Sequence, residues 1–217
     1  MSATNSATLL NILTSATARR DVAGGAYLVP AASVLLFAAL TAAAAQVSVP
    51  LPFTDVPLTL QPMVVLIGGL ALGARLGSAS QILYLAAGIA GLPVFAASAT
   101  LPPGPLRLLG PTGGYLMAYP FAAFITGWLA ERGFDRRYLG SFAAMLCGLA
   151  IIFAAGIAWL AFFARPLTGA ALSGSVPIGL SAALATGLYP FLVADIVKLA
   201  IAAGLVPAVW RVIGHPR

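Results

Sequence analysis

Long apolar stretches alternate along this chain with short segments rich in Gly, Pro and charged residues. The longer stretches approach the roughly 20 apolar residues that a helix needs to cross the hydrocarbon core of a bilayer. Pro30 and Pro190 suit the first turns of the first and last of these helices. The pattern predicts six membrane-spanning helices at 30–46, 58–72, 78–90, 112–130, 139–163 and 190–209.

The connections between these helices are of two kinds. Two of them, 73–77 and 132–137, are short and basic, as tight turns at a membrane surface would be. Long segments without regular structure are often functional, so the other three connections are the candidate functional loops. These long connections contain Pro and Gly and lie at 47–57, 91–111 and 164–189, the last with a short helix expected near 180–187.

Charge predicts how the chain is oriented. Lys and Arg near the ends of membrane helices favour the cytoplasmic side. With both termini in the cytoplasm, eight arginines near predicted helix ends lie inside, whereas only Arg107 and Arg165 lie outside. The predicted organisation is a cytoplasmic N-terminal tail at 1–28, a six-helix transmembrane domain that binds the substrate at 29–210, and a cytoplasmic C-terminal tail at 211–217.

Composition supports an integral membrane protein. Hydrophobic residues make up 61% of the 217 positions and charged residues 7%, against roughly 45–50% and 25% in soluble domains. The net charge of +6 does not indicate a nucleic-acid partner, because the basic residues lie in connections rather than on one soluble face. We predict an all-α, multi-pass protein of the bacterial cytoplasmic (inner) membrane, with no room for a nucleotide-hydrolysing domain.

An acid and a base lie three residues apart in the last predicted helix. Asp195 and Lys198 share a helix face at this spacing. Each charge costs about 2.5–3.5 kcal/mol in a membrane helix, so such residues usually face a cavity and serve a function. The favoured interpretation is a pair that contacts a ligand, and the alternative is a salt bridge that only fixes helix packing.

A glycine motif, Gly110 to Tyr115, joins the second long connection to the fourth predicted helix. Glycines let a ligand approach the backbone, and free N–H groups at a helix start favour anionic groups. Gly113, Gly114 and Tyr115 are therefore candidate ligand contacts. Glycines also allow helices to pack closely, and this alternative stays open.

Other side chains could complete a pocket. Gln46 and Tyr84 can offer amide or phenol hydrogen bonds, but each could equally bridge two helices. Five aromatic residues could wall an apolar pocket or lie in the interfacial belt, and belt or core is favoured for Tyr119 and Trp159. These five are Phe53, Phe95, Tyr115, Tyr119 and Trp159.

Small residues line the first predicted helix at a spacing that lets another helix approach closely. This face either packs inside the chain or contacts a partner subunit. Its members are Ala38, Ala39, Ala42 and Ala43.

Several of these segments, in this order, resemble the BioY family, the biotin-binding S components of energy-coupling factor (ECF) vitamin transporters. The resemblance covers most of residues 38–200, and the ordered set is more specific than any one segment. It rests on residues 45–54 (AQVSVPLPFT), 56–61 (VPLTLQ), 88–95 (GIAGLPVF), the glycine motif and the Asp195–Lys198 pair.

The resemblance implies an ECF S-component-like six-helix fold that captures biotin with high affinity near the outer face. It implies ligand contacts by Asp195 and Lys198, a polar contact after Phe95 that only Ser98 could make, and an arginine near the glycine motif, for which Arg107 is nearest. We hypothesise that Asp195 accepts a urea N–H of biotin and that Lys198, with Arg107 or backbone N–H groups near Gly113, meets its carboxylate.

Partners also follow from the resemblance. The small-residue face of the first helix would contact a transmembrane coupling subunit, and separate cytoplasmic ATPase subunits would supply energy. A homo-oligomer remains open, and no cofactor is expected besides biotin as ligand.

Two rival functions are less well supported by the sequence. An ion- or proton-coupled small-molecule carrier could use the Asp195/Lys198 pair as its relay, although one pair without internal repeats gives it little support. A membrane enzyme is disfavoured, because His215 is the only histidine and no Asp pair or metal-ligand cluster lies within the predicted helices.

Overall fold

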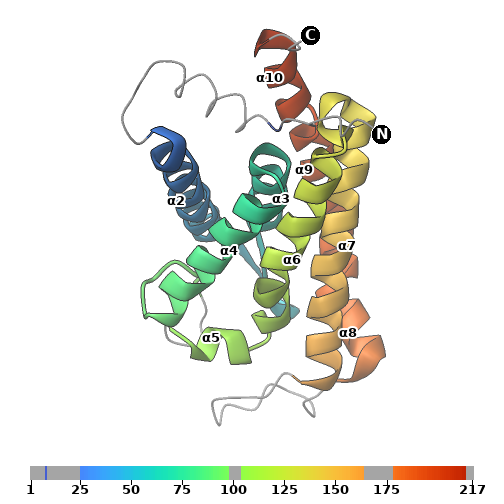
Figure 1. Cartoon of the computed structure of the whole chain (residues 1–217). Helices are drawn as coiled ribbons and strands as arrows, with labels where there is room; N and C mark the ends of the chain where they lie inside the picture. The colour runs from blue at the N-terminus through green and yellow to red at the C-terminus, as the bar shows by residue number, and fades with distance from the viewer. Residues whose placement is uncertain (1–7, 9–24, 98–103, 164–177, 214–217) are drawn as a thin grey trace.

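The computed structural model describes residues 8, 25–97, 104–163 and 178–213. Helices make up most of this part of the chain (Figure 1). They are α2 (Gly25–Gln46), α3 (Gln61–Leu72), α4 (Ala74–Ile89), α5 (Leu106–Leu109), α6 (Gly113–Ala130), η1 (Phe134–Arg136), α7 (Tyr138–Phe162), α8 (Gly179–Gly187), α9 (Tyr189–Ala202) and α10 (Leu205–Ile213).

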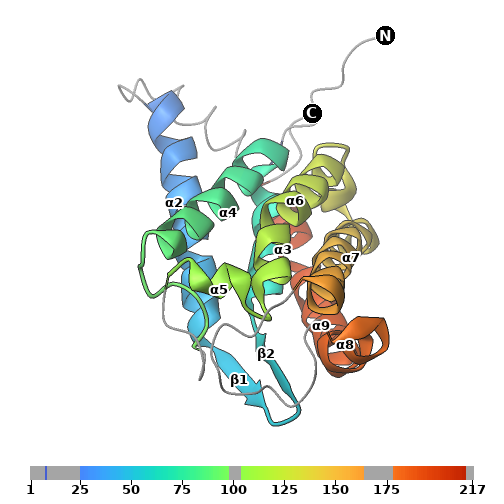
Figure 2. The same cartoon turned by 90° about the horizontal axis from the view of Figure 1, so that it is seen from below.

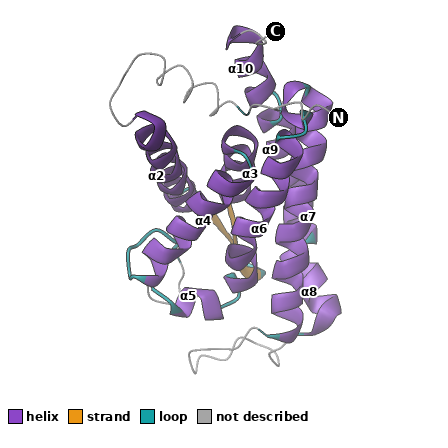
Figure 3. Cartoon of the chain, in the orientation of Figure 1, coloured by secondary structure: helices purple, strands orange, loops and turns teal. Residues whose placement is uncertain are grey.

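The first long connection forms a β-hairpin, so the prediction of an all-α chain was wrong here and the fold is mostly helical. Its strands are β1 (Ser48–Leu51) and β2 (Thr54–Thr59), shown in orange in Figure 3. Leu51 pairs with Thr54, which leaves a two-residue turn of the kind that closes hairpins. The register shifts within β1 around Pro50, and bulges are among the places where a sheet tolerates proline.

Two helix boundaries also differ from the prediction. Helix α2 begins at Gly25, so Pro30 lies inside the helix rather than in its first turn. An apolar surrounding favours a longer helix, because backbone groups there need internal partners. The last predicted helix is divided at Ala203 and Gly204 into α9 and α10. Pro190 does lie in the first turn of α9, and the short helix expected near 180–187 is confirmed as α8.

Three stretches of the described chain are helical, long and apolar enough to cross a membrane, with mean hydropathies of 2.1, 2.3 and 2.0. Helix α3 has 12 residues, or about 18 Å at 1.5 Å per residue, less than the roughly 30 Å of a hydrocarbon core. By length and composition the structure therefore supports three of the six predicted spans. The three are Tyr27–Gln46, Tyr138–Phe162 and Tyr189–Val212.

Helix α6 packs against α3, α4 and α7, and glycines bring these helices close. A Cβ on Gly69 of α3 would lie 2.6 Å from the carbonyl oxygen of Ala123 in α6, and a Cβ on Gly127 would overlap the backbone of Gly73. Small residues at helix contacts are typical of membrane bundles, where packing is a main driving force. These contacts fix the ends of α3, α4 and α6 relative to one another.

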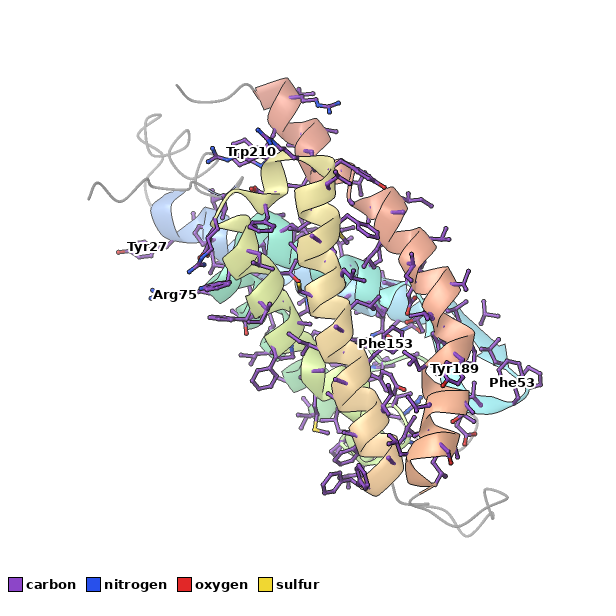
Figure 4. The ribbon with its side chains drawn as sticks, turned by 90° about the vertical axis from the view of Figure 1, so that its right-hand side faces the viewer. Tyr27, Phe53, Arg75, Phe153, Tyr189 and Trp210 are labelled. Carbon is purple, nitrogen blue, oxygen red and sulfur yellow. The ribbon has the colours of Figure 1, made fainter. Side chains whose placement is uncertain are left out.

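The two ends of the bundle differ. The start of α2 and the end of α10 lie at one end, and α5 and α8 lie at the other (Figure 1). At the first end, the indole Nε1 of Trp210 donates a hydrogen bond to the Asp135 carboxylate at 2.7 Å, which ties α10 to the turn between α6 and α7 (Figure 4). The hairpin and α5 frame the second end (Figure 2).

Candidate functional site

A cavity of about 250 Å³ lies between the hairpin, α5, the first turns of α6 and α9, and the middle of α7. Its volume lies just below the range for small-molecule sites, roughly 300–1,000 Å³. Its wall includes residues from segments that are far apart in the sequence: Pro50, Leu51, Thr54 to Thr59, Gln61, Pro62, Phe95 to Ala97, Arg107, Pro111, Thr112, Tyr115, Leu116, Tyr119, Ile152, Phe153, Phe191 and Asp195.

Asp195 contributes a carboxylate to this wall and is 4% exposed. The Lys198 Nζ lies 2.7 Å from its Oδ1 and also donates to the carbonyl oxygen of Thr59 at 2.7 Å. The predicted pair therefore forms, but only Asp195 is among the cavity-lining residues. Lys198 lies behind it, neutralises the buried charge and joins α9 to the end of β2, so a role in packing and a role at the site coexist.

The start of α3 adds an amide to the wall. Gln61 is 3% exposed and lines the cavity. Its Nε2 donates to the hydroxyl of Tyr84 at 2.6 Å, and that hydroxyl donates to the carbonyl of Val94 at 3.3 Å. The structure thus places Tyr84, a predicted ligand contact, behind Gln61 and outside the cavity lining.

Arg107 on α5 supplies a cation. Its side chain is 7% exposed and lines the cavity. Burial lowers the pKa of its guanidinium from the ordinary value, an effect partly opposed by Tyr84. Arginine keeps its charge through such shifts because its unperturbed pKa is above 12. The cavity wall therefore has a buried carboxylate from Asp195 on α9, an exposed one from Asp55 on the hairpin, and a guanidinium on α5.

The remaining wall is largely apolar and aromatic. Tyr115, Tyr119, Phe95 and Phe191 line it, as does Phe153, which lies between α7 and α9 in Figure 4. The Tyr115 hydroxyl donates to the carbonyl of Gly187 at 2.8 Å, so this side chain is held by α8. Tyr119 is buried in the core, which confirms the favoured interpretation of this residue, and it also lines the cavity.

Other predicted contacts lie away from the cavity lining. Gly113 and Gly114 pack against α5 and α7, because added Cβ atoms would overlap the Leu108 carbonyl and the Trp159 side chain. This arrangement matches the close-packing alternative. Phe53 is 59% exposed at the hairpin turn (Figure 4), and Ser98 lies outside the described residues.

Gln46 also lies outside the lining. It is exposed, and its Nε2 is within 3.3 Å of the carbonyls of Ala42 and Pro93 and 3.5 Å of that of Phe95. It therefore joins the end of α2 to the segment that carries Phe95. This geometry fits the alternative that Gln46 bridges two elements.

The four alanines of α2 divide between two faces. Ala38 is buried in the core and Ala42 packs partly against it, whereas Ala39 and Ala43 are exposed. Of the predicted partner-contacting face, only these two exposed alanines are fully available to another chain.

Sequence reasoning understated one part of the site. Thr54 to Thr59 and Gln61 line the cavity through the hairpin and the turn after it. The sequence does contain an indication of this. Gln61 follows a Pro-rich run and is the first residue of an apolar helix, where a polar side chain needs a hydrogen-bond partner. In the described chain, no group of three His, Cys, Asp or Glu side chains is placed to hold a metal ion.

The arrangement suits a small organic ligand. Apolar walls exclude water, the Asp195 carboxylate accepts N–H donors, and Arg107 attracts an anionic group. Gln61 adds an amide of fixed orientation. These groups together can bind a small organic ligand and fix its orientation.

Comparison with known proteins identifies the family of this chain. The BioY family model matches residues 15–215. A "Probable biotin transporter BioY" from Pyrococcus horikoshii is 43% identical over 169 residues, which cover 78% of this chain and 88% of that protein. A "Biotin transporter BioY" from Thermotoga maritima is 34% identical over 168 residues, covering 77% and 88%.

A solved structure shares the fold. The S-component for biotin from an ECF-type ABC transporter superimposes with a TM-score of 0.69 at 24% sequence identity. The match covers 84% of this chain and 90% of that one. The predicted S-component-like fold is therefore confirmed.

Proposed function

This chain belongs to the BioY family, whose model it matches over residues 15–215, and from this premise we propose that it captures biotin for uptake across the cytoplasmic membrane. It acts as the substrate-binding subunit of an ECF-type transporter and is not an enzyme. Its family membership and its relatives named as biotin transporters support this function.

The observation that carries the proposal is the buried carboxylate of Asp195 in the wall of an otherwise largely apolar cavity. Biotin has a urea with two N–H groups, an apolar bicyclic ring and a carboxylate tail. A buried carboxylate is costly unless it gains strong hydrogen bonds, and urea N–H groups supply them. In our proposal Asp195 accepts a urea N–H.

The carboxylate of biotin is assigned to Arg107. Both this side chain and Asp195 line the cavity, whereas Lys198 does not. An arginine can bind a carboxylate through two parallel N–H bonds. Lys198 therefore acts on biotin through Asp195, while Tyr115 and Phe191 contact the ring.

The arrangement in the membrane extends this proposal. Six spans, formed by α2, α3, α4, α6, α7 and α9 with α10, cross the cytoplasmic membrane with both termini inside. The cavity then opens toward the outer side, where biotin arrives. The exposed Ala39 and Ala43 of α2 contact a transmembrane coupling subunit, and cytoplasmic ATPase subunits supply the energy.

Binding by the purified chain tests the function. We expect mass spectrometry after mild extraction to detect biotin in the preparation, and calorimetry to show saturable binding in detergent. Asp195→Asn should weaken binding by about tenfold or more, since a charged hydrogen bond contributes about 1.5–3 kcal/mol. Arg107→Gln should weaken the binding of biotin more than the binding of biotin amide, because the amide lacks the anionic group.

The matched control is Asp135→Asn, a change at a buried aspartate on the opposite end of the bundle. It should leave biotin affinity within about twofold. A chain that binds no biotin, or an Asp195→Asn variant with wild-type affinity, would refute the assignment. Uptake that depends on an ion gradient and not on ATPase subunits would instead favour the rival carrier.

A further inference from the structure

Tyr84 lies in the middle of α4 and is 1% exposed. It is outside the cavity lining, yet it contacts three residues that are part of that lining. Gln61 donates to its hydroxyl, the Phe95 ring meets its ring edge to face at 5.5 Å, and the Tyr119 ring lies 6.4 Å away. One buried side chain therefore supports three parts of the wall.

The hydroxyl of Tyr84 fixes the orientation of Gln61. It accepts from Gln61 Nε2 at 2.6 Å and donates to the Val94 carbonyl at 3.3 Å. The other end of the same amide, Oε1, accepts from the Thr59 hydroxyl at 3.4 Å. In this orientation the Tyr84 hydroxyl can accept from Gln61 because its own proton goes to the Val94 carbonyl, and the Thr59 hydroxyl supplies the donor for Oε1.

The same hydroxyl holds the segment after α4. Val94 precedes Phe95, Ala96 and Ala97, which line the cavity. The Phe95 ring lies over Gly88, one helical turn after Tyr84, where an added Cβ would overlap the ring. Tyr84 thus connects the start of α3 to a segment more than thirty positions later in the chain.

We propose that Tyr84 is a positioning residue for the ligand: without touching biotin, it fixes the Gln61 amide and the Val94–Ala97 segment as one wall. This inference rests on the proposed function. Loss of the hydroxyl leaves Gln61 Nε2 without its partner and frees the Val94 carbonyl, so the wall loosens around the bound ligand. The main effect is on dissociation, because differences between closely related complexes usually lie there.

Tyr84→Phe tests the inference, because it removes only the hydroxyl and keeps the ring contacts. We expect biotin dissociation to become about tenfold faster with association within about twofold. The matched control is Tyr138→Phe, which also removes a tyrosine hydrogen bond to a carbonyl, that of Ala200 at 2.9 Å. Tyr138 is at the start of α7, at the end of the bundle away from α5, so its variant should keep both rates.

A double-mutant cycle with Gln61→Met separates positioning from other roles. Because Tyr84 acts partly through Gln61 and partly through the Val94 carbonyl, Tyr84→Phe should cause a clearly smaller loss in the Gln61→Met background than in the wild type. Fully additive losses would overturn the inference, because they indicate a direct ligand contact or a general loss of stability. Wild-type rates in Tyr84→Phe would overturn it as well. No biotin binding by the wild-type chain would refute the proposed function itself, and the inference with it.

Discussion

Lys198 and Thr59, 139 positions apart in the chain, meet where α9 passes the end of β2: the ammonium donates to the Thr59 carbonyl at 2.7 Å. The same ammonium pairs with the Asp195 carboxylate. The Lys198 ammonium therefore bonds both to the hairpin and to Asp195, the acidic residue of the cavity wall on α9. The hairpin and the acidic residue of the cavity wall are thus joined through one side chain.

Removing the cation should destabilise the protein as well as weaken binding. Lys198→Met leaves Asp195 as a buried charge without its partner, which typically costs about 3–5 kcal/mol. We expect a lower unfolding temperature in detergent and at least about tenfold weaker biotin binding. Thermal unfolding and calorimetry measure the two effects.

The double variant Asp195→Asn/Lys198→Met is the control for this prediction. It removes both charges, so most of the lost stability should return, whereas biotin binding should not. Recovery of binding in the double variant would contradict the role of the Asp195 carboxylate.

The sequence was sufficient to predict this pair because helix periodicity relates residues three apart without any tertiary information. It was also sufficient for most helix positions, since segments rich in Gly, Pro and charged residues separate the apolar stretches. The second partner of Lys198, the Thr59 carbonyl, could not be predicted. Every residue has a backbone carbonyl, so the residue type does not indicate which one accepts a hydrogen bond. The glycines were ambiguous for the same reason: Gly114 permits a ligand or a helix to approach, and only the position of Trp159 decides between them.

The hairpin turn separates residues that line the cavity from residues that do not. Phe53 is exposed and points away from the cavity, whereas Val56 is buried and lines it. We expect Phe53→Ser to leave biotin affinity within about twofold. Val56→Ser should weaken it about tenfold, since an unpaired hydroxyl in an apolar wall costs about 1–3 kcal/mol. Equilibrium binding in detergent measures both, and the opposite ranking would show that the turn folds over the ligand.

Close packing at the glycine motif predicts a loss of stability without loss of affinity. A Cβ at position 114 would overlap Trp159 on α7, and overpacking typically costs about 1–3 kcal/mol. Gly114→Ala should lower the unfolding temperature by about 2–8 °C while biotin affinity at low temperature changes less than about threefold.

Gly204→Ala provides the comparison for the glycine motif. Its added Cβ would have only ordinary contacts, the nearest at 3.7 Å from the Ile201 carbonyl oxygen. Its unfolding temperature should stay within about 2 °C of the wild type. A large loss of affinity in Gly114→Ala would instead indicate that the motif contacts the ligand.

The Asp135–Trp210 contact predicts a dependence of stability on pH. Burial raises the pKa of the Asp135 carboxyl above its ordinary value of 3.8, although the hydrogen bond from Trp210 and the charge of Arg136 oppose this effect. The folded chain therefore binds this proton more tightly than the unfolded chain, and the contribution to stability falls as pH rises through and above 3.8.

Asp135→Asn should remove this dependence, because an amide oxygen still accepts from Trp210 Nε1 and carries no charge to bury. We expect the variant to unfold at a higher temperature than the wild type at neutral pH, and the difference to shrink toward zero as pH approaches 3, where the carboxyl is protonated in both states. Unfolding temperatures in detergent between pH 3 and pH 7 test this expectation. A difference that stays constant across that range would mean that Asp135 stabilises α10 through geometry alone, without a contribution from its charge.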